Sequence, residues 1–443
     1  MKQNNQKEDR RNFLKNIGFG LLGISVLSNF SFENFLGSKA LAKELPDFKI
    51  EGKKDLIYHG EKPLTAETEI YALDSDFTKP ENFFVRNNGL LPSLETIKER
   101  LHKGWTLEID GESIINKKSY TIEDLKKKFK TYTYALTVEC GGNGRSEVIP
   151  STKGTQWGYG AVACGRWTGV RLGNGRSEVI PSTKGTQWGY GAVACGRWTG
   201  VRLKDILKDC GIKNDAVYIG YYGIDTKLNG EETSPISRGV PISKALQDET
   251  LIAWAYEGKD IPLVNGYPLR LVCGGYPAST SGKWLYKISV RNKIHDGEKM
   301  EGSYKVPVNP VKPGDFNYKG EMKIIESMPI RSVITNIKNG SEIKANKKFE
   351  VRGKAWAGEL EVSEVYISND YGVTWTKAKV EKPLNRLAWQ KWSTQISIPT
   401  KGYYEIWARA IDSQGNSQPM VLAQWNPGGY INNACHRVNV YGV

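Results

Sequence analysis

The interpretation of this chain starts from the stretch Thr137-Val-Glu-Cys-Gly-Gly-Asn-Gly-Arg145. Residues 132–138 are mostly β-branched and aromatic, which predicts a strand that ends at Cys140. The glycines after the cysteine allow the backbone to approach a bulky ligand, and Arg145 can place a guanidinium beside the same point. The stretch alone fits a ligand-binding thiol and a buried structural cysteine before a turn equally well.

A perfect tandem repeat begins inside this stretch. Residues 142–172 read GNGRSEVIPSTKGTQWGYGAVACGRWTGVRL, and residues 173–203 repeat all 31 letters. Natural repeat arrays diverge and need at least three units to bury a shared core, so we interpret the repeat as a recent duplication or an assembly error and not as a solenoid. Cys164 and Cys195 are therefore one residue counted twice. We expect the first copy to form the turn after the strand and the second copy to lead into a helix at 203–210.

The N-terminal segment 1–42 is predicted to be a twin-arginine export signal. It contains Arg10-Arg11-Asn-Phe-Leu-Lys15, an apolar run over 17–32, and small residues in Ala40-Leu-Ala42 at the positions that a signal peptidase reads. The apolar run is short and interrupted by Gly and Ser, so no stable membrane anchor is expected. Because this route exports folded proteins, often with a cofactor already inserted, we expect a periplasmic protein with a prosthetic group.

The composition predicts a globular chain with more than one core. The chain has 443 residues, of which 39% are hydrophobic and 25% charged, so it is too long for one typical domain and too apolar for a disordered protein. Its formal net charge of +14 favours an anionic partner. The basic residues are scattered and the signal directs the chain out of the cytoplasm, so nucleic acid is not expected to be that partner.

The sequence pattern divides the rest of the chain into two domains. From 43 to 320, short β-rich runs alternate with short helical ones, including a capped helix over 122–129, which predicts an α+β domain. A proline-punctuated linker ends this domain. From 321 to 443, apolar and polar residues alternate in short strands, and Asn369-Asp-Tyr-Gly372 supplies a hairpin turn. This second pattern predicts an immunoglobulin-like β-sandwich.

A series of short runs extends the pattern over nearly the whole chain after residue 42. These runs are Phe83-Phe-Val-Arg-Asn-Asn88, Glu139-Cys-Gly-Gly-Asn-Gly-Arg145, KGTQWGYGAVACGRWTGVRL, Ala255-Tyr256-Glu-Gly, Asn265-Gly-Tyr-Pro-Leu-Arg270, Ser281-Gly-Lys-Trp-Leu285, Trp425-Asn-Pro-Gly-Gly-Tyr430 and Asn432-Asn-Ala-Cys-His-Arg437. In this order they resemble the sulfite oxidase family of molybdenum enzymes. The resemblance implies an α+β molybdopterin-binding domain, an immunoglobulin-like dimerisation domain, the molybdenum–molybdopterin cofactor and a homodimer.

The resemblance also implies roles for particular residues. Cys140 would be the thiolate ligand of molybdenum, since a soft sulfur suits a redox-active metal. Arg86 and Arg145 would line an oxyanion pocket, because planar guanidinium groups match the oxygens of sulfite and sulfate. Tyr256 would donate a hydrogen bond near the metal. The cofactor contacts would be Asn88, Arg238, Lys283 and one of the two repeat lysines, Lys153 and Lys184.

These roles lead to a hypothesis for the reaction. The chain would oxidise sulfite to sulfate, and because it contains no CxxCH haem motif, its electrons would pass to a separate c-type cytochrome. The chain departs from the family at Asn88, where the family usually has histidine, and at Asn265, where it often does. The other cysteines match no metal ligand of the family, so we expect them to be small buried residues. Two alternatives stay open: a sulfane dehydrogenase subunit of a thiosulfate-oxidising complex, and a cofactor-free periplasmic anion-binding protein. A reductase of nitrate or sulfoxides is less favoured.

Overall fold

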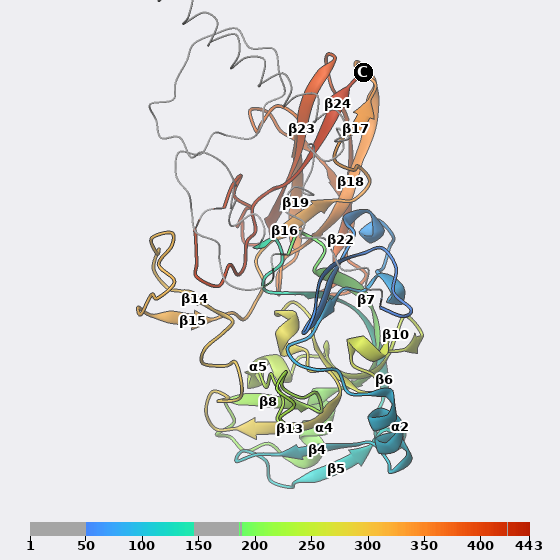
Figure 1. The fold of residues 1–443 in the computed structure, drawn as a ribbon, viewed down its shortest axis with the longest axis vertical. Coiled ribbons are helices and arrows are strands. Elements are labelled where there is room, and N and C mark those ends of the chain that lie inside the picture. Colours follow the sequence, from blue (N-terminus) through green and yellow to red (C-terminus); the bar gives the residue numbers. More distant parts are fainter. Residues whose placement is uncertain (1–49, 146–185, 187, 423) are drawn as a thin grey trace, which may run out of the picture. The chain divides into compact units, whose positions relative to one another are not determined.

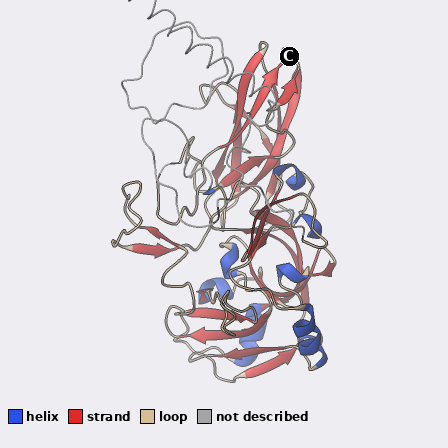
Figure 2. Cartoon of the chain, viewed as in Figure 1, coloured by secondary structure: helices blue, strands red, loops and turns tan. Residues whose placement is uncertain are grey.

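The computed structural model describes residues 50–145, 186, 188–422 and 424–443. Strands dominate these residues and the helices are short (Figure 2). A helix with the length and apolar character that a bilayer requires does not occur in these ranges. The export signal predicted for 1–42 lies outside them. The α-helices are α2 (Leu94–His102), α3 (Ile122–Lys128), α4 (Leu203–Cys210) and α5 (Ile242–Ala245), and short 3-10 turns occur at Ile70–Leu73, Pro80–Asn82, Leu263–Asn265 and Ala278–Thr280.

Sheets of three and five strands build the described part of the first domain (Figure 1). Together with the helices they confirm the predicted mixed α+β class. The N-terminal sheet has the order β1 (Leu56–Glu61), β2 (Leu64–Thr68), β3 (Val85–Arg86). A second sheet has the order β5 (Lys118–Thr121), β4 (Thr106–Asp110), β13 (Leu285–Arg291), β8 (Tyr218–Gly223), β9 (Gly239–Pro241). The third has the order β11 (Lys259–Asp260), β10 (Thr250–Tyr256), β7 (Val193–Arg202), β6 (Thr131–Glu139), and β12 (Arg270–Cys273) also pairs with β10.

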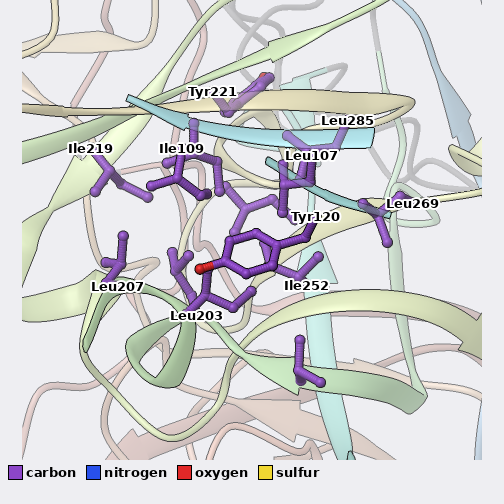
Figure 3. Close-up of a cluster of buried hydrophobic side chains, with 14 of the residues drawn as sticks. Leu107, Ile109, Tyr120, Leu203, Leu207, Ile219, Tyr221, Ile252, Leu269 and Leu285 are labelled. Carbon is purple, nitrogen blue, oxygen red and sulfur yellow. The ribbon is translucent and has the colours of Figure 1, made fainter. Parts of the chain in front are cut away.

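Helices α3 and α4 form where the sequence predicts them. The Thr121 side chain accepts the N–H of Asp124, whose carboxylate accepts the N–H of Thr121 in return, so the expected capping box starts α3. Helix α4 buries its apolar side and stops at Gly211, which has a φ of +77°. Both helices contribute to one apolar core, into which Tyr120 and Leu203 point (Figure 3). Burial of this apolar surface is the main force that holds the short helices on the sheets.

Strand β6 pairs along its whole length with β7, and Glu139 lies opposite Val193 at the end of the ladder. The turn residues 142–145 that follow β6 come from the first copy of the repeat, whereas β7 comes from the second copy. This confirms the prediction that the first copy forms the turn after the strand and that the second copy leads into the helix at 203–210. The change from one copy to the other falls within 146–185, outside the described residues.

Removing one copy of the repeat is expected to leave the fold intact. Because the copies are identical, deleting 173–203 gives the same sequence as deleting 151–181, which contains none of the described residues. Nine residues then join Arg145 to Thr186, whose carbonyl already accepts a 2.6 Å hydrogen bond from the Arg145 side chain. The shorter connection lowers the entropic cost of chain closure by about 1.3 kcal/mol. We expect an unchanged or higher melting temperature and soluble yield, and failure to fold would show that both copies are required.

The described part of the C-terminal domain contains two sheets that share one apolar core. Val351 from one sheet and Val365 and Ile406 from the other are buried in it. The predicted hairpin turn at 369–372 joins β19 to β20, with Gly372 at a φ of +83°. The sheets have the orders β16 (Arg331–Ile334), β18 (Lys348–Trp356), β22 (Gln390–Ser397), β21 (Lys379–Val380) and β17 (Ser341–Ile343), β24 (His436–Gly442), β23 (Gly402–Asp412), β19 (Val362–Ser368), β20 (Thr376–Lys377). A separate ladder of β14 (Lys305–Pro307) and β15 (Met322–Ile324) spans the domain boundary predicted at 320.

Candidate functional site

A pocket lies at the end of strand β6, beside Cys140. It holds about 620 Å³ of atom-free space, part of which is open to solvent. Its lining combines aromatic rings, amides and hydroxyls with cationic side chains and one carboxylate. The lining residues are Phe83, Phe84, Arg86, Asn88, Cys140, Tyr221, Asp225, Ile236, Asn265, Arg270, Ala278, Ser279, Ser281, Lys283 and Tyr304.

The turn after β6 fixes the position of Cys140. The Cys140 N–H donates to the carbonyl of Ala192 at 2.8 Å, and its own carbonyl accepts the N–H of Asn143 at 2.9 Å. Burial raises the pKa of the Cys140 thiol, whereas the positive charges of Arg86 and Arg145 oppose that rise. A metal ion bound to this sulfur would hold it in the thiolate form despite its burial.

Several buried nitrogen donors around the pocket have no acceptor among the described residues. Arg86, at the end of β3, has an unpartnered Nη1, and Asn87 has an unpartnered Nδ2. Arg238 and Arg270 each have an unpartnered Nε. A buried donor without an acceptor costs about 1–3 kcal/mol, so native proteins rarely keep such groups without a use. The arrangement therefore suits a ligand that is rich in acceptor oxygens and negatively charged.

Lys283 reaches the backbone behind Arg86. Its Nζ donates to the carbonyls of Arg86 at 3.2 Å and Val264 at 3.1 Å, and to the Oδ1 of Asn87. Burial lowers the pKa of Lys283, and burial also raises the pKa of Asp225 to about 6. Both shifts arise because these groups are held away from water. An anionic ligand would favour the charged form of the lysine.

Of the other two predicted cofactor contacts, Asn88 lines the pocket and Arg238 contacts residues of its lining. The Oδ1 of Asn88 accepts a hydrogen bond from Lys299 at 3.0 Å. Arg238 is fully buried, and its Nη1 donates to the hydroxyl of Ser279 at 2.6 Å. Its guanidinium carbon lies 4.7 Å from the centre of the Tyr304 ring. Ser279 and Tyr304 both line the pocket, so Arg238 supports its wall from behind.

Arg145 stands next to Cys140 but is not part of the pocket lining. Its Nε donates to the carbonyl of Gly428 at 2.9 Å and its Nη1 to the carbonyl of Thr186 at 2.6 Å. The guanidinium carbon lies 5.1 Å from the ring centre of Tyr430. These contacts hold the guanidinium beside the turn, where its charge acts on the Cys140 thiol.

The structure does not bring Tyr256 to the pocket. Tyr256 is fully buried, its hydroxyl donates to the carbonyl of Thr78 at 2.6 Å, and its ring lies 4.7 Å from that of Trp198. The hydroxyl proton is used in this bond, so the arrangement does not support the predicted hydrogen bond near the metal. The predicted contacts of Lys153 and Lys184 lie outside the described residues.

Two further cationic residues, one in the pocket lining and one bonded to a lining residue, were not singled out from the sequence. Arg270 is completely buried, which lowers the pKa of its guanidinium to about 10. The Nζ of Lys53 donates to the Oδ1 of Asn265 at 2.5 Å, and burial lowers the pKa of Lys53 to about 7. Arg270 is the last residue of the run 265–270 that contributes to the family resemblance. That run could have drawn attention to Arg270, but it does not show that the side chain is buried.

The other described cysteines are buried, as expected. They are Cys195, Cys210, Cys273 and Cys435. Only Cys140 among the described cysteines lines the pocket. Cys164 lies outside the described residues.

The residues at the pocket fit a cofactor that contains a metal and an anionic group such as a phosphate. Cys140 offers a soft sulfur ligand at one end. The unpartnered donors of Arg86, Arg238 and Arg270, together with Lys283, offer positive charge to a phosphate.

Comparison with protein-family models gives two matches in this chain. The oxidoreductase molybdopterin binding domain matches residues 94–174 and 172–299, two stretches that meet within the repeat. The Mo-co oxidoreductase dimerisation domain matches residues 322–442. Both halves of the fold described above are thus covered.

Sulfite oxidases are among the similar proteins. The chain is 30% identical over 398 residues to mitochondrial sulfite oxidase of Drosophila melanogaster, covering 86% of this chain and 62% of that protein. It is 28% identical over 399 residues to the human enzyme, covering 86% and 65% of the two chains. The solved structure of the sulfane dehydrogenase SoxCD from Paracoccus pantotrophus matches with a TM-score of 0.64 and 20% identity, over 89% of this chain and 91% of that one. The chain thus spans about two thirds or slightly less of the sulfite oxidases, and the SoxCD match shows the shared fold.

The fold, the pocket and the family models together define an oxidoreductase that binds molybdopterin. Within this class, the chain belongs to the sulfite oxidase family of molybdenum enzymes. Its cofactor is accordingly the molybdenum–molybdopterin group, and the pocket beside Cys140 has the residues to bind it.

Proposed function

We propose that the protein oxidises sulfite to sulfate at a molybdenum centre bound by Cys140. The observation that supports this proposal best is that Arg86 lines the pocket together with Cys140, while Arg145 is held in the turn that follows Cys140. Guanidinium groups match the oxygens of a sulfur oxyanion in both substrate and product. The relatives that carry the name sulfite oxidase support the same substrate.

Each group in the site has a separate task in this proposal. The cofactor, when bound, supplies the two-electron redox chemistry. Cys140 holds the metal, while Arg238 and Lys283 neutralise the anionic part of the cofactor and Asn88 borders it. Arg145 is kept in place by its bonds to backbone carbonyls and binds the substrate oxyanion. One of the two repeat lysines completes the pocket.

The cellular setting is proposed from the sequence. The twin-arginine motif places the protein in the periplasm, and electrons pass to a separate c-type cytochrome. The protein forms a homodimer through its C-terminal domain, which we take to be immunoglobulin-like. Two sheets around one core and the match to a dimerisation domain support this part of the proposal.

Cofactor analysis combined with a substrate comparison tests the proposal. Protein purified from a host that makes the cofactor should contain about one molybdenum and one pterin per chain. It should reduce ferricyanide or cytochrome c when sulfite is added. A folded protein that binds sulfite without molybdenum would support the anion-binding alternative. Activity with a carrier-bound sulfane, in the absence of sulfite oxidation, would support the sulfane dehydrogenase alternative.

A further inference from the structure

We propose that the C-terminal domain positions the Cys140 ligand through a buried ion pair between Glu139 and Arg331. The inference rests on the proposed function, because it takes Cys140 as the metal ligand. Glu139 is the last residue of β6 and Arg331 is the first residue of β16, so the pair joins the two domains. Nη1 of Arg331 lies 3.0 Å from Oε1 of Glu139, and the two side chains are 1% and 2% exposed.

The Glu139 carboxylate accepts hydrogen bonds from three surrounding side chains. The indole N–H of Trp356 donates to its Oε2 at 2.7 Å, and the side chain of Asn143 donates to its Oε1 at 3.0 Å. Arg331 and Trp356 are partners in the ladder between β16 and β18, so both donors project from one sheet. Nη1 of Arg331 also donates to the carbonyl of Asn143 at 2.9 Å. The sheet of the C-terminal domain therefore fixes both the residue before Cys140 and the turn after it.

Two further bonds attach the turn to the same domain. The side chain of Asn432 donates to the carbonyl of Gly144 at 2.8 Å, and the N–H of Ile431 donates to the carbonyl of Gly141 at 2.9 Å. The backbone on the far side of Cys140 is thus held by the loop before β24. A displacement of the C-terminal domain would move the sulfur relative to the pocket.

The ion pair also sets the charge next to the metal ligand. In the native protein the two opposite charges balance. A guanidinium stays protonated in proteins, so replacement of Glu139 alone leaves an uncompensated positive charge near the Cys140 sulfur. A positive charge stabilises the reduced metal and raises its reduction potential. A role that is only structural would not change the potential in this direction.

The test compares holoenzyme variants of the pair with a surface control. The variants are Glu139→Gln, Arg331→Gln and the double variant, and the control is Arg352→Gln. Arg352 also joins the two domains, at 2.7 Å from Asp74, but its side chain is 45% exposed. Redox titration followed by electron paramagnetic resonance gives the molybdenum potential, and thermal unfolding gives the melting temperature.

We expect a positive shift of the potential in Glu139→Gln and a return toward the native value in the double variant. Arg331→Gln should shift the potential in the negative direction, and Arg352→Gln should leave it unchanged. Each single substitution in the buried pair should lower the melting temperature by roughly 5–10 °C, and the double variant should lose less. Trp356→Phe removes a hydrogen bond without a charge, so it should lower the melting temperature without shifting the potential.

An unchanged potential in Glu139→Gln, or a shift that the double variant does not reverse, overturns the inference even if the melting temperature falls. If Glu139→Gln does not fold, the negative shift in Arg331→Gln decides in its place, and its absence has the same meaning. Failure of the proposed function shows itself differently. In that case the native holoenzyme does not oxidise sulfite, whereas failure of the inference leaves sulfite oxidation intact and removes only the expected shifts of the potential.

Discussion

Replacement of Cys140 by serine is expected to abolish sulfite oxidation while the chain still folds. A hard hydroxyl is a poor substitute for a thiolate at molybdenum. Loss of a residue that only supports a metal ligand already costs about 10–100-fold, so loss of the ligand itself should lower kcat by more than about a hundredfold. The fold should survive because the contacts of Cys140 within the turn are made by its backbone N–H and carbonyl. Steady-state rates with ferricyanide or cytochrome c, together with the molybdenum content, measure the effect.

Cys195→Ser is the matched control for this substitution. Cys195 is buried on the neighbouring strand β7, it does not line the pocket, and serine differs from it only in the atom at the γ position. Its turnover should remain close to the native value. Near-native turnover in Cys140→Ser would instead remove this cysteine from the metal site.

Local sequence patterns predict the individual elements of this fold well. The capping box at Thr121, the stop at Gly211 and the hairpin at 369–372 each depend on residues that are close in the sequence. The order of strands in the sheets is different, because it depends on packing between distant segments. For example, β4 lies parallel to β13, although more than 170 residues separate them. No local pattern specifies that neighbour.

Site residues that belong to a recognisable motif can be predicted from the sequence. Residues that reach the pocket, or fail to reach it, because of the path of the backbone are harder to predict. Cys140, Arg86 and Lys283 belong to recognisable runs, and they meet at one pocket. Arg270 was missed because its burial results from the surrounding chain and not from its own sequence neighbours. Tyr256 follows an irregularity in strand β10, where the register shifts between residues 253 and 255. Such a bulge changes the face to which later side chains point, and the sequence does not show it.

Arg145→Gln is expected to weaken sulfite binding far more than it slows turnover at saturation. Loss of a charge-assisted contact with the oxyanion costs about 2 kcal/mol, which corresponds to a rise in KM of about 30-fold. Glutamine also lacks the geometry to reach the carbonyls of both Gly428 and Thr186, which now hold the guanidinium in place. Arg145→Lys keeps the charge but not the planar fork, so it should recover only part of the affinity. Initial rates over a range of sulfite concentrations separate the effect on KM from that on kcat.

Arg176→Gln is an unusually close control, because Arg176 is the same residue of the same 31-residue unit in the second copy. The turn beside Cys140 is built from the first copy, and Arg145 is tied to it by its own backbone N–H, which donates to the carbonyl of Gly142 at 3.0 Å. Arg176 therefore has no place in that turn while Arg145 occupies it, and its replacement should leave KM unchanged. Equal effects of the two substitutions would contradict this assignment, because they would mean that either copy can supply the arginine.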